Sequence, residues 1–355
     1  MRAPVHCLQK WWKNTGAGSD NDHGARRHCD KSSAVYRKSG DARRLCTNMA
    51  VSGCDLLFSI GTRFNDRITG KLHEFAPHAQ IVHIDIDTAS ISRNIHVDIP
   101  IVADAKEALT KMTEYVEECE NKKMACADRG MERGASASDE TACIDEPLDI
   151  IEEMNRQFDD AIITTDVGQH MMLVSQYAEI TEKKQLVMSG GLGTMGYGFP
   201  AAIGAQIGNP EKRVIAVSGD GGMQMNIQEF ATAVLEETPV IACVFNNTYL
   251  GMVRQWQKLF YGKRYGMTNL RAGALSRRTD GAEFPEYTPD FVKLAESYGA
   301  KGIRVTKTEE ISAAFEEAKK NTKTPTLIEF IIDPEEMVYP MIKPGGTLED
   351  MIMDC

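Results

Sequence analysis

Two polar side chains, Asp220 and Asn247, each follow an apolar run in the second half of the chain. The runs, 213–218 and 240–245, are typical of buried parallel strands, and one helix and one strand separate the two residues. Because the carboxyl ends of parallel strands meet at one edge of a sheet, we expect both side chains at that edge. A carboxylate, an amide oxygen and phosphate oxygens suit Mg²⁺. Either motif alone would favour the alternative interpretation, an ordinary Gly-Asp or Asn-Asn turn.

Three glycines, Gly219, Gly221 and Gly222, surround Asp220. Where no side chain intervenes, backbone N–H groups at a helix N-terminus can approach a phosphate group closely. The sequence therefore predicts that a diphosphate lies beside the metal.

A second glycine-rich segment, 189–198, follows a predicted strand and opens a predicted helix. Gly191, Gly193 and Gly196 match the dinucleotide pattern GxGxxG, and Asp220 lies 24 residues beyond the last of them. That arrangement would indicate a nicotinamide cofactor, although this pattern alone is weak. A tight turn before a closely packed helix explains the same glycines. A nicotinamide-dependent dehydrogenase is therefore kept only as an alternative.

The elements that must position these residues alternate between apolar runs and helical segments, after a first helix over 147–158. This alternation predicts an α/β fold, a doubly wound six-stranded parallel sheet with helices on both faces. The predicted strands are 161–165, 186–188, 213–218, 240–245, 302–305 and 326–332, and the predicted helices are 169–178, 195–207, 223–236, 249–259, 289–298 and 309–320.

The chain upstream contains a smaller pattern of the same kind. Three apolar runs and a helix predict part of a second doubly wound α/β domain over 48–117, with strands 55–61, 80–87 and 100–104 and a helix 105–116. The predicted division of the chain is 1–47 as a disordered or foreign segment, 48–117 as this partial domain, 118–146 as a charged linker, 147–333 as the main domain and 334–355 as a tail.

The overall composition excludes several classes of protein. Apolar residues make up 42% and charged residues 26% of 355 residues, which is ordinary globular usage. The net charge is −11; residues 1–50 hold ten Lys/Arg and four Asp/Glu, a net of +6, so 51–355 carry −17. An acidic body binds nucleic acid poorly, and no apolar run approaches a membrane span. Nine cysteines without a CxxC pair fit reduced thiols in a cytoplasmic protein.

Two sets of motifs carry a resemblance to a known family. Segments 219–221 and 246–247 resemble the metal motif of thiamine-diphosphate enzymes. Segments 251–257 and 189–200 resemble, more closely, the large catalytic subunit of acetohydroxyacid synthases, also called acetolactate synthases. The resemblance runs from about 48 to 353.

The resemblance implies a role for each matching residue of the main domain. Asp220 and Asn247, with the backbone carbonyl of Tyr249, would bind Mg²⁺. Met195 would bend the cofactor between its two rings, although a single Met is more often a core residue. Trp256 would line the channel to the reacting carbon, and it could equally be a core residue. The residues that would contact thiamine diphosphate are Gln169, His170, Gly193, Met195, Gly219, Gly221, Gly222, Asn247, Gly251 and Met252.

The upstream domain resembles the FAD-binding middle domain of that family over 61–67 and 83–87. By this resemblance, Arg67 would lie near the FAD and the substrate channel, and the tail 334–355 would fold over the active site. The residues that would contact FAD are Gly61, Arg63, Asp85, Ile86, Asp104 and Ala105.

The activity implied by the resemblance is carboligation. Pyruvate would lose carbon dioxide, and the two-carbon remainder would join pyruvate or 2-oxobutyrate, giving 2-acetolactate or 2-aceto-2-hydroxybutyrate for valine, leucine and isoleucine synthesis. FAD would be structural because no net redox change occurs. The full enzyme would be a cytoplasmic homodimer or homotetramer with a small regulatory subunit, or plastid-located if from a plant or alga. The alternatives are a glyoxylate carboligase, a pyruvate oxidase, or an inactive fragment or interaction module.

The sequence departs from this family at its beginning. The family has a further N-terminal domain that donates a glutamate to the pyrimidine ring, and no segment of this sequence resembles it. We therefore expect the chain to be the C-terminal part of the enzyme. By itself it would keep the metal and diphosphate ligands but show little carboligase activity.

Overall fold

The computed structural model describes residues 45–115, 143–144, 146–181, 183–270 and 289–353. It divides into two compact units. The first holds residues up to 133 together with 180–182 and 339–355, and the second holds 134–179 and 183–338. Residues 1–44 of the predicted segment 1–47 lie outside the described residues, as does the predicted linker 118–146 except for 143, 144 and 146.

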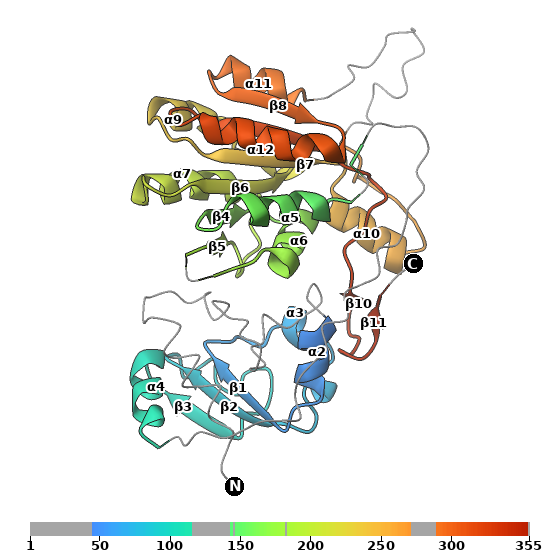
Figure 1. Cartoon of the computed structure of the whole chain (residues 1–355). Coiled ribbons are helices and arrows are strands. Elements are labelled where there is room, and N and C mark those ends of the chain that lie inside the picture. The colour runs from blue at the N-terminus through green and yellow to red at the C-terminus, as the bar shows by residue number, and fades with distance from the viewer. Residues whose placement is uncertain (1–44, 116–142, 145, 182, 271–288, 354–355) are drawn as a thin grey trace. The chain divides into compact units, whose positions relative to one another are not determined.

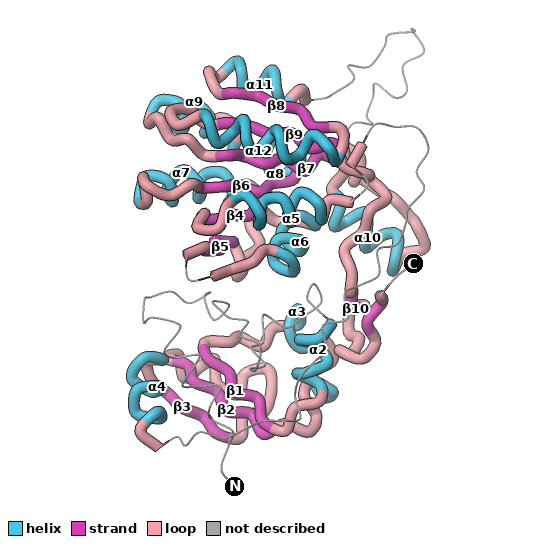
Figure 2. The backbone as a smooth tube through the Cα atoms, viewed as in Figure 1, coloured by secondary structure: helices cyan, strands magenta, loops and turns pink. Residues whose placement is uncertain are grey.

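The second unit is built on the predicted six-stranded sheet, which is confirmed. All neighbouring strands are parallel, and each strand end lies within one residue of its predicted position. In spatial order the strands are β5 (Gln185–Met188), β4 (Ile162–Thr165), β6 (Val214–Gly219), β7 (Ile241–Asn246), β9 (Thr326–Ile331) and β8 (Lys301–Val305). Figure 2 shows the strands between layers of helix.

Helices cover both faces of this sheet, as a doubly wound fold requires. Figure 1 shows α5, α6 and α12 on one face and α7, α9 and α11 on the other. Their bounds are α5 (Leu148–Gln157), α6 (Gln169–Tyr177), α7 (Gly198–Gly208), α9 (Glu229–Leu235), α11 (Phe291–Ser297) and α12 (Ile311–Lys320), with α10 (Gly251–Phe260) following β7.

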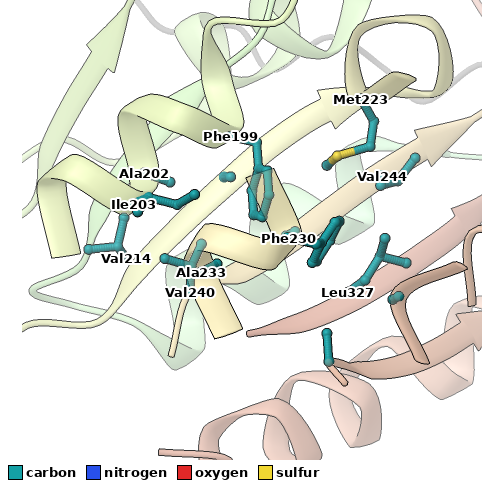
Figure 3. Close-up of a cluster of buried hydrophobic side chains, with 14 of the residues drawn as sticks. Phe199, Ala202, Ile203, Val214, Met223, Phe230, Ala233, Val240, Val244 and Leu327 are labelled. Carbon is teal, nitrogen blue, oxygen red and sulfur yellow. The ribbon is translucent and has the colours of Figure 1, made fainter. Parts of the chain in front are cut away.

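The core on the α7 and α9 face shows why these segments pack (Figure 3). Alternate residues of the strands, such as Val244 and Leu327, face the rings of Phe199 and Phe230, whose centroids lie 4.4 Å apart. All four side chains are almost fully buried, and each contributes about 1.5–3 kcal/mol by leaving water. This rigid core fixes the carboxyl edge of the sheet.

Two predicted helices are corrected by the structure. The predicted helix 223–236 is interrupted: α8 (Asp220–Met223) and a 3₁₀ turn (Gln224–Asn226) precede α9. The Asn226 side chain donates to the carbonyl of Gly196 at 2.7 Å, which ties this turn to the glycine-rich loop. The predicted helix 195–207 begins only at Gly198, because Gly196 has φ 90°, outside the helical region.

The end of the predicted linker belongs to the main sheet. The Ile144 N–H donates to the Ile331 carbonyl at 2.8 Å, and Ile144 forms a parallel bridge with Ile332. Ile144 is fully buried. The chain therefore joins the second unit before α5 begins.

The first unit contains a three-stranded parallel sheet in the order β1-β2-β3, as predicted for the partial domain. Its elements are α2 (Leu45–Ser52), β1 (Leu56–Ile60), α3 (Asp66–Thr69), a 3₁₀ turn (Leu72–Glu74), β2 (Gln80–Asp85), β3 (Ile99–Val102) and α4 (Ala105–Thr113). α2 crosses the boundary predicted at residue 47.

The C-terminal segment packs on this first unit. Its two short strands, β10 (Met341–Ile342) and β11 (Met351–Ile352), pair antiparallel. Ile342 and Leu348 join the buried cluster that contains Val51 and Phe64. That the tail also covers an active site stays a prediction. Among the described residues, no helix combines the length and the apolar character that a membrane crossing requires.

Candidate functional site

The structure places Asp220 and Asn247 at the same edge of the main sheet. β6 and β7 are parallel neighbours with Gly219 opposite Phe245, so Asp220 and Asn247 both lie just past the strand ends. The Asp220 carboxylate lies within reach of the N–H groups of Gly221 and Thr248, the second of which belongs to the loop after β7. The convergence expected from the sequence is therefore present.

The Asp220 carboxylate is buried and only half paired. Its side chain is 4% exposed, and Oδ1 accepts from the Gly221 N–H at 2.8 Å. Oδ2 has no hydrogen-bond partner among the described residues. Burial raises the pKa of Asp220 to about 7, against the lowering effect of the Gly221 and Thr248 N–H groups. A buried carboxylate with one unsatisfied oxygen is suited to a cation.

The loop after β7 is shaped by the two asparagines. Asn246 Oδ1 accepts from the Thr248 N–H and Asn247 Oδ1 from the Tyr249 N–H, both at 3.0 Å. These are two consecutive side-chain turns of the Asx type. Tyr249 also forms an antiparallel bridge with Asn269. An amide oxygen accepts two bonds, so Asn247 Oδ1 keeps a lone pair for a metal.

These residues fit a magnesium site by their donor chemistry. Asp220 supplies one carboxylate, Asn247 an amide oxygen and Tyr249 a backbone carbonyl, all hard oxygen ligands. No cluster of three or more His, Cys, Asp and Glu that could hold a metal occurs within the described ranges. Because Mg²⁺ prefers six ligands, the three that this chain would supply leave further positions for phosphate oxygens.

A chain of side-chain amides extends from Asn247 to the end of the unit. Asn247 Nδ2 donates to Gln169 Oε1 at 3.4 Å, and Gln169 Nε2 donates to Gln255 Oε1 at 2.7 Å. Gln255, 2% exposed, exchanges two hydrogen bonds with the peptide of Val338 at 2.8 and 3.0 Å. Gln169 is thus held at the site by α10 and by the segment before residue 339.

Gly251, the first residue of α10, leaves the space that these amides occupy. A Cβ atom there would overlap Gln169 Oε1 and lie 2.7 Å from Asn247 Nδ2. The close approach therefore requires glycine.

We expect Gly251→Ala to fold but to bind its metal and cofactor at least about tenfold more weakly, because it displaces side chains that orient a metal ligand. The measurement is the melting temperature as a function of Mg²⁺ concentration, with thiamine diphosphate present. Gly266→Ala is the matched control, since no atom lies within 4 Å of its added Cβ. Equal Mg²⁺ requirements for the two variants would contradict the assignment.

His170, in the first turn of α6, packs beside the Asp220 turn. A Cβ atom on Gly219 would lie 3.1 Å from the ring, which shows how closely the backbone approaches it. The ring is buried, and Nε2 has no hydrogen-bond partner among the described residues. Burial lowers the pKa of His170 to about 4, although Asp166 opposes this. The imidazole is therefore neutral at pH 7, with one nitrogen available to a ligand.

Asp166 is a site residue that the sequence analysis did not select. Its carboxylate accepts from the N–H groups of Val167, Gly196 and Gly198 at 2.8–3.1 Å. These bonds anchor the glycine-rich loop against β4. The available signal was its position, since Asp166 follows a predicted strand just as Asp220 does.

The glycine-rich loop brings Met195 to the same place. The Met195 methyl lies 3.5 Å from where a Cβ on Gly221 would be, so the thioether contacts the α8 turn. Gly193 has φ 64°, which favours glycine, and its N–H donates to the Ser189 carbonyl at 3.1 Å. The roles of Met195 and Gly193 toward a cofactor stay predictions.

Trp256 and Met252 lie about one turn apart on α10. They line a groove of about 430 Å³ with Val253, Gln257, Tyr261 and Arg264. The Trp256 ring packs edge-on against Phe260 at 5.4 Å. The predicted role of Trp256 in choosing the second keto acid stays a prediction.

The residues predicted for FAD gather at one edge of the first unit's sheet. Gly61 follows β1, Asp85 ends β2, and Asp104 and Ala105 follow β3; Arg63 and Ile86 are close behind in sequence. Asp104 Oδ1 caps α4 by accepting from two N–H groups, and Asp85 Oδ1 accepts from the Asp87 N–H at 2.8 Å. Ile86 is 73% exposed, and Arg67 pairs with Asp66 at 3.5 Å. Their roles stay predictions.

Two family models match the chain. Thiamine pyrophosphate enzyme, C-terminal TPP binding domain, matches residues 166–330, which hold Asp220, Asn247 and the glycine-rich loop. Thiamine pyrophosphate enzyme, central domain, matches residues 29–112 and so begins within the segment 1–47.

Curated relatives extend the similarity along the chain. A probable acetolactate synthase large subunit of Methanocaldococcus jannaschii is 40% identical over 316 residues, covering 86% of this chain and 51% of that protein. An acetolactate synthase large subunit of Corynebacterium glutamicum is 39% identical (85% and 48% covered). The acetolactate synthase isozyme 3 large subunit of Escherichia coli is 36% identical (86% and 52% covered).

The chain spans about half the length of the curated relatives it matches. Within that half, the C-terminal TPP binding domain match includes Asp220, Asn247 and five of the six strands of the main sheet. The chain belongs to the thiamine pyrophosphate enzymes and carries their central domain and their C-terminal TPP binding domain.

Proposed function

We propose that this chain supplies the metal and diphosphate half of a carboligase of the acetolactate synthase type, acting on pyruvate and 2-oxobutyrate. The observation that carries the proposal is the half-paired, buried carboxylate of Asp220 beside the Asn246-Asn247 turns. The names of the relatives support the choice of reaction over a glyoxylate carboligase or a pyruvate oxidase.

In this proposal each side chain of the site has a defined task. Asp220, Asn247 and the Tyr249 carbonyl hold Mg²⁺. The backbone N–H groups around Gly221 and the neutral ring of His170 bind the diphosphate. When bound, thiamine diphosphate supplies the electron sink for decarboxylation and carbon–carbon bond formation.

The remaining residues orient and shield the reaction. Met195 presses on the cofactor from the glycine-rich loop, which Asp166 anchors. The groove beside Trp256 and Met252 receives the second keto acid against its largely apolar walls.

We extend the proposal to FAD and to assembly. FAD would bind, without a redox role, at the strand ends that carry Gly61, Asp85 and Asp104. The term large subunit in the relatives' names supports assembly with a smaller regulatory subunit, in a homodimer or homotetramer of large subunits. A cytoplasmic location is part of the same proposal.

Cofactor binding is tested by thermal unfolding. Thiamine diphosphate with Mg²⁺ at about 100 times the dissociation constant should stabilise the fold by about 2.7 kcal/mol, a rise of about 5–10 °C for a unit of this size. Thiamine diphosphate with EDTA, and thiamine without phosphates, should leave the melting temperature unchanged. A rise with NADH but not with thiamine diphosphate would support the dehydrogenase instead.

The reaction is tested in a protein that also holds the other half of a relative. A chimeric enzyme is made in which residues 48–353 of this chain replace the matching segment of the Escherichia coli relative. Its products from pyruvate and 2-oxobutyrate are then quantified. We expect acetolactate formation, lost on Asp220→Ala. Oxygen uptake with pyruvate, or a ligated product from glyoxylate alone, would favour the pyruvate oxidase or glyoxylate carboligase alternatives.

A further inference from the structure

Glu329 is a buried carboxylate on a strand that lies inside the main sheet, next to its edge strand. It lies on β9, opposite Val244 of β7 on one side and Arg304 of β8 on the other. The residue is 0% exposed. Replacing a buried ion pair by apolar side chains is often neutral or stabilising, so packing alone does not explain a charge here.

Both carboxylate oxygens of Glu329 are engaged. Oε1 accepts from Asn246 Nδ2 at 2.7 Å, and Oε2 accepts from Arg304 Nε at 2.8 Å. Arg304 in turn donates through Nη2 to Asp290 Oδ1 at 2.7 Å, at the start of α11. Burial raises the pKa of Glu329, whereas Asn246 and Arg304 favour its charged form. The row of side chains crosses three neighbouring strands and ends at the loop after β7.

The carboxylate determines which way the Asn246 amide faces. A carboxylate only accepts hydrogen bonds, so the amide nitrogen must face Glu329 and the amide oxygen must face the Thr248 N–H. Thr248 has φ 61°, a conformation that β-branched residues rarely adopt. It therefore needs a partner that holds it there, and Asn246 Oδ1 is that partner at 3.0 Å.

We propose that Glu329 is a positioning residue for the Mg²⁺ loop 246–250: it orients the Asn246 amide, which holds Thr248 and so places Asn247 and Tyr249 at the metal. Glu329 itself lies one strand away from the metal ligands. This inference rests on the proposed function, since it assigns a device to that metal site.

Three variants of the full chain test the device through metal affinity. Glu329→Gln removes the charge, and Asn246→Asp removes the donor and sets two carboxylates against each other. We expect each to raise the Mg²⁺ concentration for half-maximal thermal stabilisation, with thiamine diphosphate present, about 10- to 100-fold. The double variant combines Glu329→Gln with Asn246→Asp and so exchanges the donor and the acceptor. The amide at position 329 can donate to the carboxylate at position 246 and accept from Arg304. The double variant should need less Mg²⁺ than Asn246→Asp.

A matched control separates positioning from stability. Glu153 is a carboxylate of the same unit that pairs with Arg156 on α5. Glu153→Gln should lower the melting temperature while leaving the Mg²⁺ requirement at the parent value. An unchanged Mg²⁺ requirement in Glu329→Gln would overturn the proposal. If Glu329→Gln does not fold, the comparison of Asn246→Asp with the double variant decides. A lower Mg²⁺ requirement in the double variant supports the positioning role of Glu329, and an equal requirement overturns it.

A second measurement needs no cofactor. Amide hydrogen exchange at Thr248 and Tyr249 reports whether the loop stays closed. We expect exchange at both positions at least about tenfold faster in Glu329→Gln than in the parent, and parent-like in Glu153→Gln. Unchanged exchange would overturn the inference even if the parent binds thiamine diphosphate. If the parent binds no thiamine diphosphate but Glu329→Gln still exchanges faster, the proposed function is wrong. The role of Glu329 in holding the loop is then still supported.

Discussion

Asp220→Asn is expected to make the cofactor-free chain more stable at pH 8 and to abolish its response to Mg²⁺. A pKa of about 7 in the fold, against 3.8 for a free carboxyl, corresponds to about 4 kcal/mol of destabilisation once the group is ionised. Burying the new amide nitrogen without a partner offsets about 1–3 kcal/mol of this gain. The net gain expected is therefore about 1–3 kcal/mol.

The pH dependence follows from the direction of this shift. The pKa of Asp220 is higher in the folded than in the unfolded state. The free energy of unfolding of the parent therefore falls as the pH rises from about 4 to 7, and above pH 7 this contribution is constant. The advantage of Asp220→Asn should have almost disappeared at pH 4, because the folded carboxyl is then protonated and the unfolded one is only partly ionised. Urea unfolding at pH 4, 6 and 8, with and without Mg²⁺ and thiamine diphosphate, measures both effects. A variant less stable than the parent at pH 8, or still stabilised by Mg²⁺, would contradict the assignment.

Gly198→Ala and Gly204→Ala, two substitutions in the same helix, should have opposite effects on stability. A Cβ on Gly198 would lie 2.5 Å from the Asp166 nitrogen and 2.9 Å from the Thr165 carbonyl carbon, both backbone atoms at the end of β4. Backbone held in a sheet cannot move aside cheaply, so we expect a loss of about 1–3 kcal/mol. Gly204 is exposed with nothing within 4 Å of its added Cβ, so alanine should gain about 0.5–1 kcal/mol.

The same pair should differ in cofactor binding. The Gly198 N–H donates a hydrogen bond to the Asp166 carboxylate at 3.1 Å. Gly198→Ala should weaken this bond and so disturb the glycine-rich loop that Asp166 anchors. Its urea midpoint should fall and its melting temperature should respond less to thiamine diphosphate with Mg²⁺. Gly204→Ala should respond as the parent does. A destabilised Gly204→Ala would show that α7 is not packed as described.

The main sheet was predictable because its strands are fully buried. Continuous apolar runs such as 213–218 and 240–245 mark both ends of a parallel strand, so the observed bounds differ by at most one residue. The interruption of the predicted helix 223–236 was not predictable in this way. It depends on Asn226 reaching the Gly196 carbonyl, a contact between segments 30 residues apart.

The candidate site was predictable only where a strand end places a residue directly. Asp220 and Asn247 follow strands and were found, and so was their shared edge. Asp166 also follows a predicted strand, but the sequence analysis assigned roles only to Gln169 and His170 in the segment that it begins. Glu329 lies inside an apolar strand, and its role depends on hydrogen bonds to Asn246 of β7 and Arg304 of β8. These residues are far apart in sequence, so no local sequence pattern indicates the contacts.

The two consecutive turns at Asn246-Asn247 also bear on how fast the metal can bind. The chain's own hydrogen bonds hold this loop, so its conformational entropy is lost during folding and not during association. Mg²⁺ gives up its water molecules reluctantly. The slow step of association should then be dehydration of the ion, with a rate set by the chemistry of Mg²⁺ and not by a search of the polypeptide for its closed form.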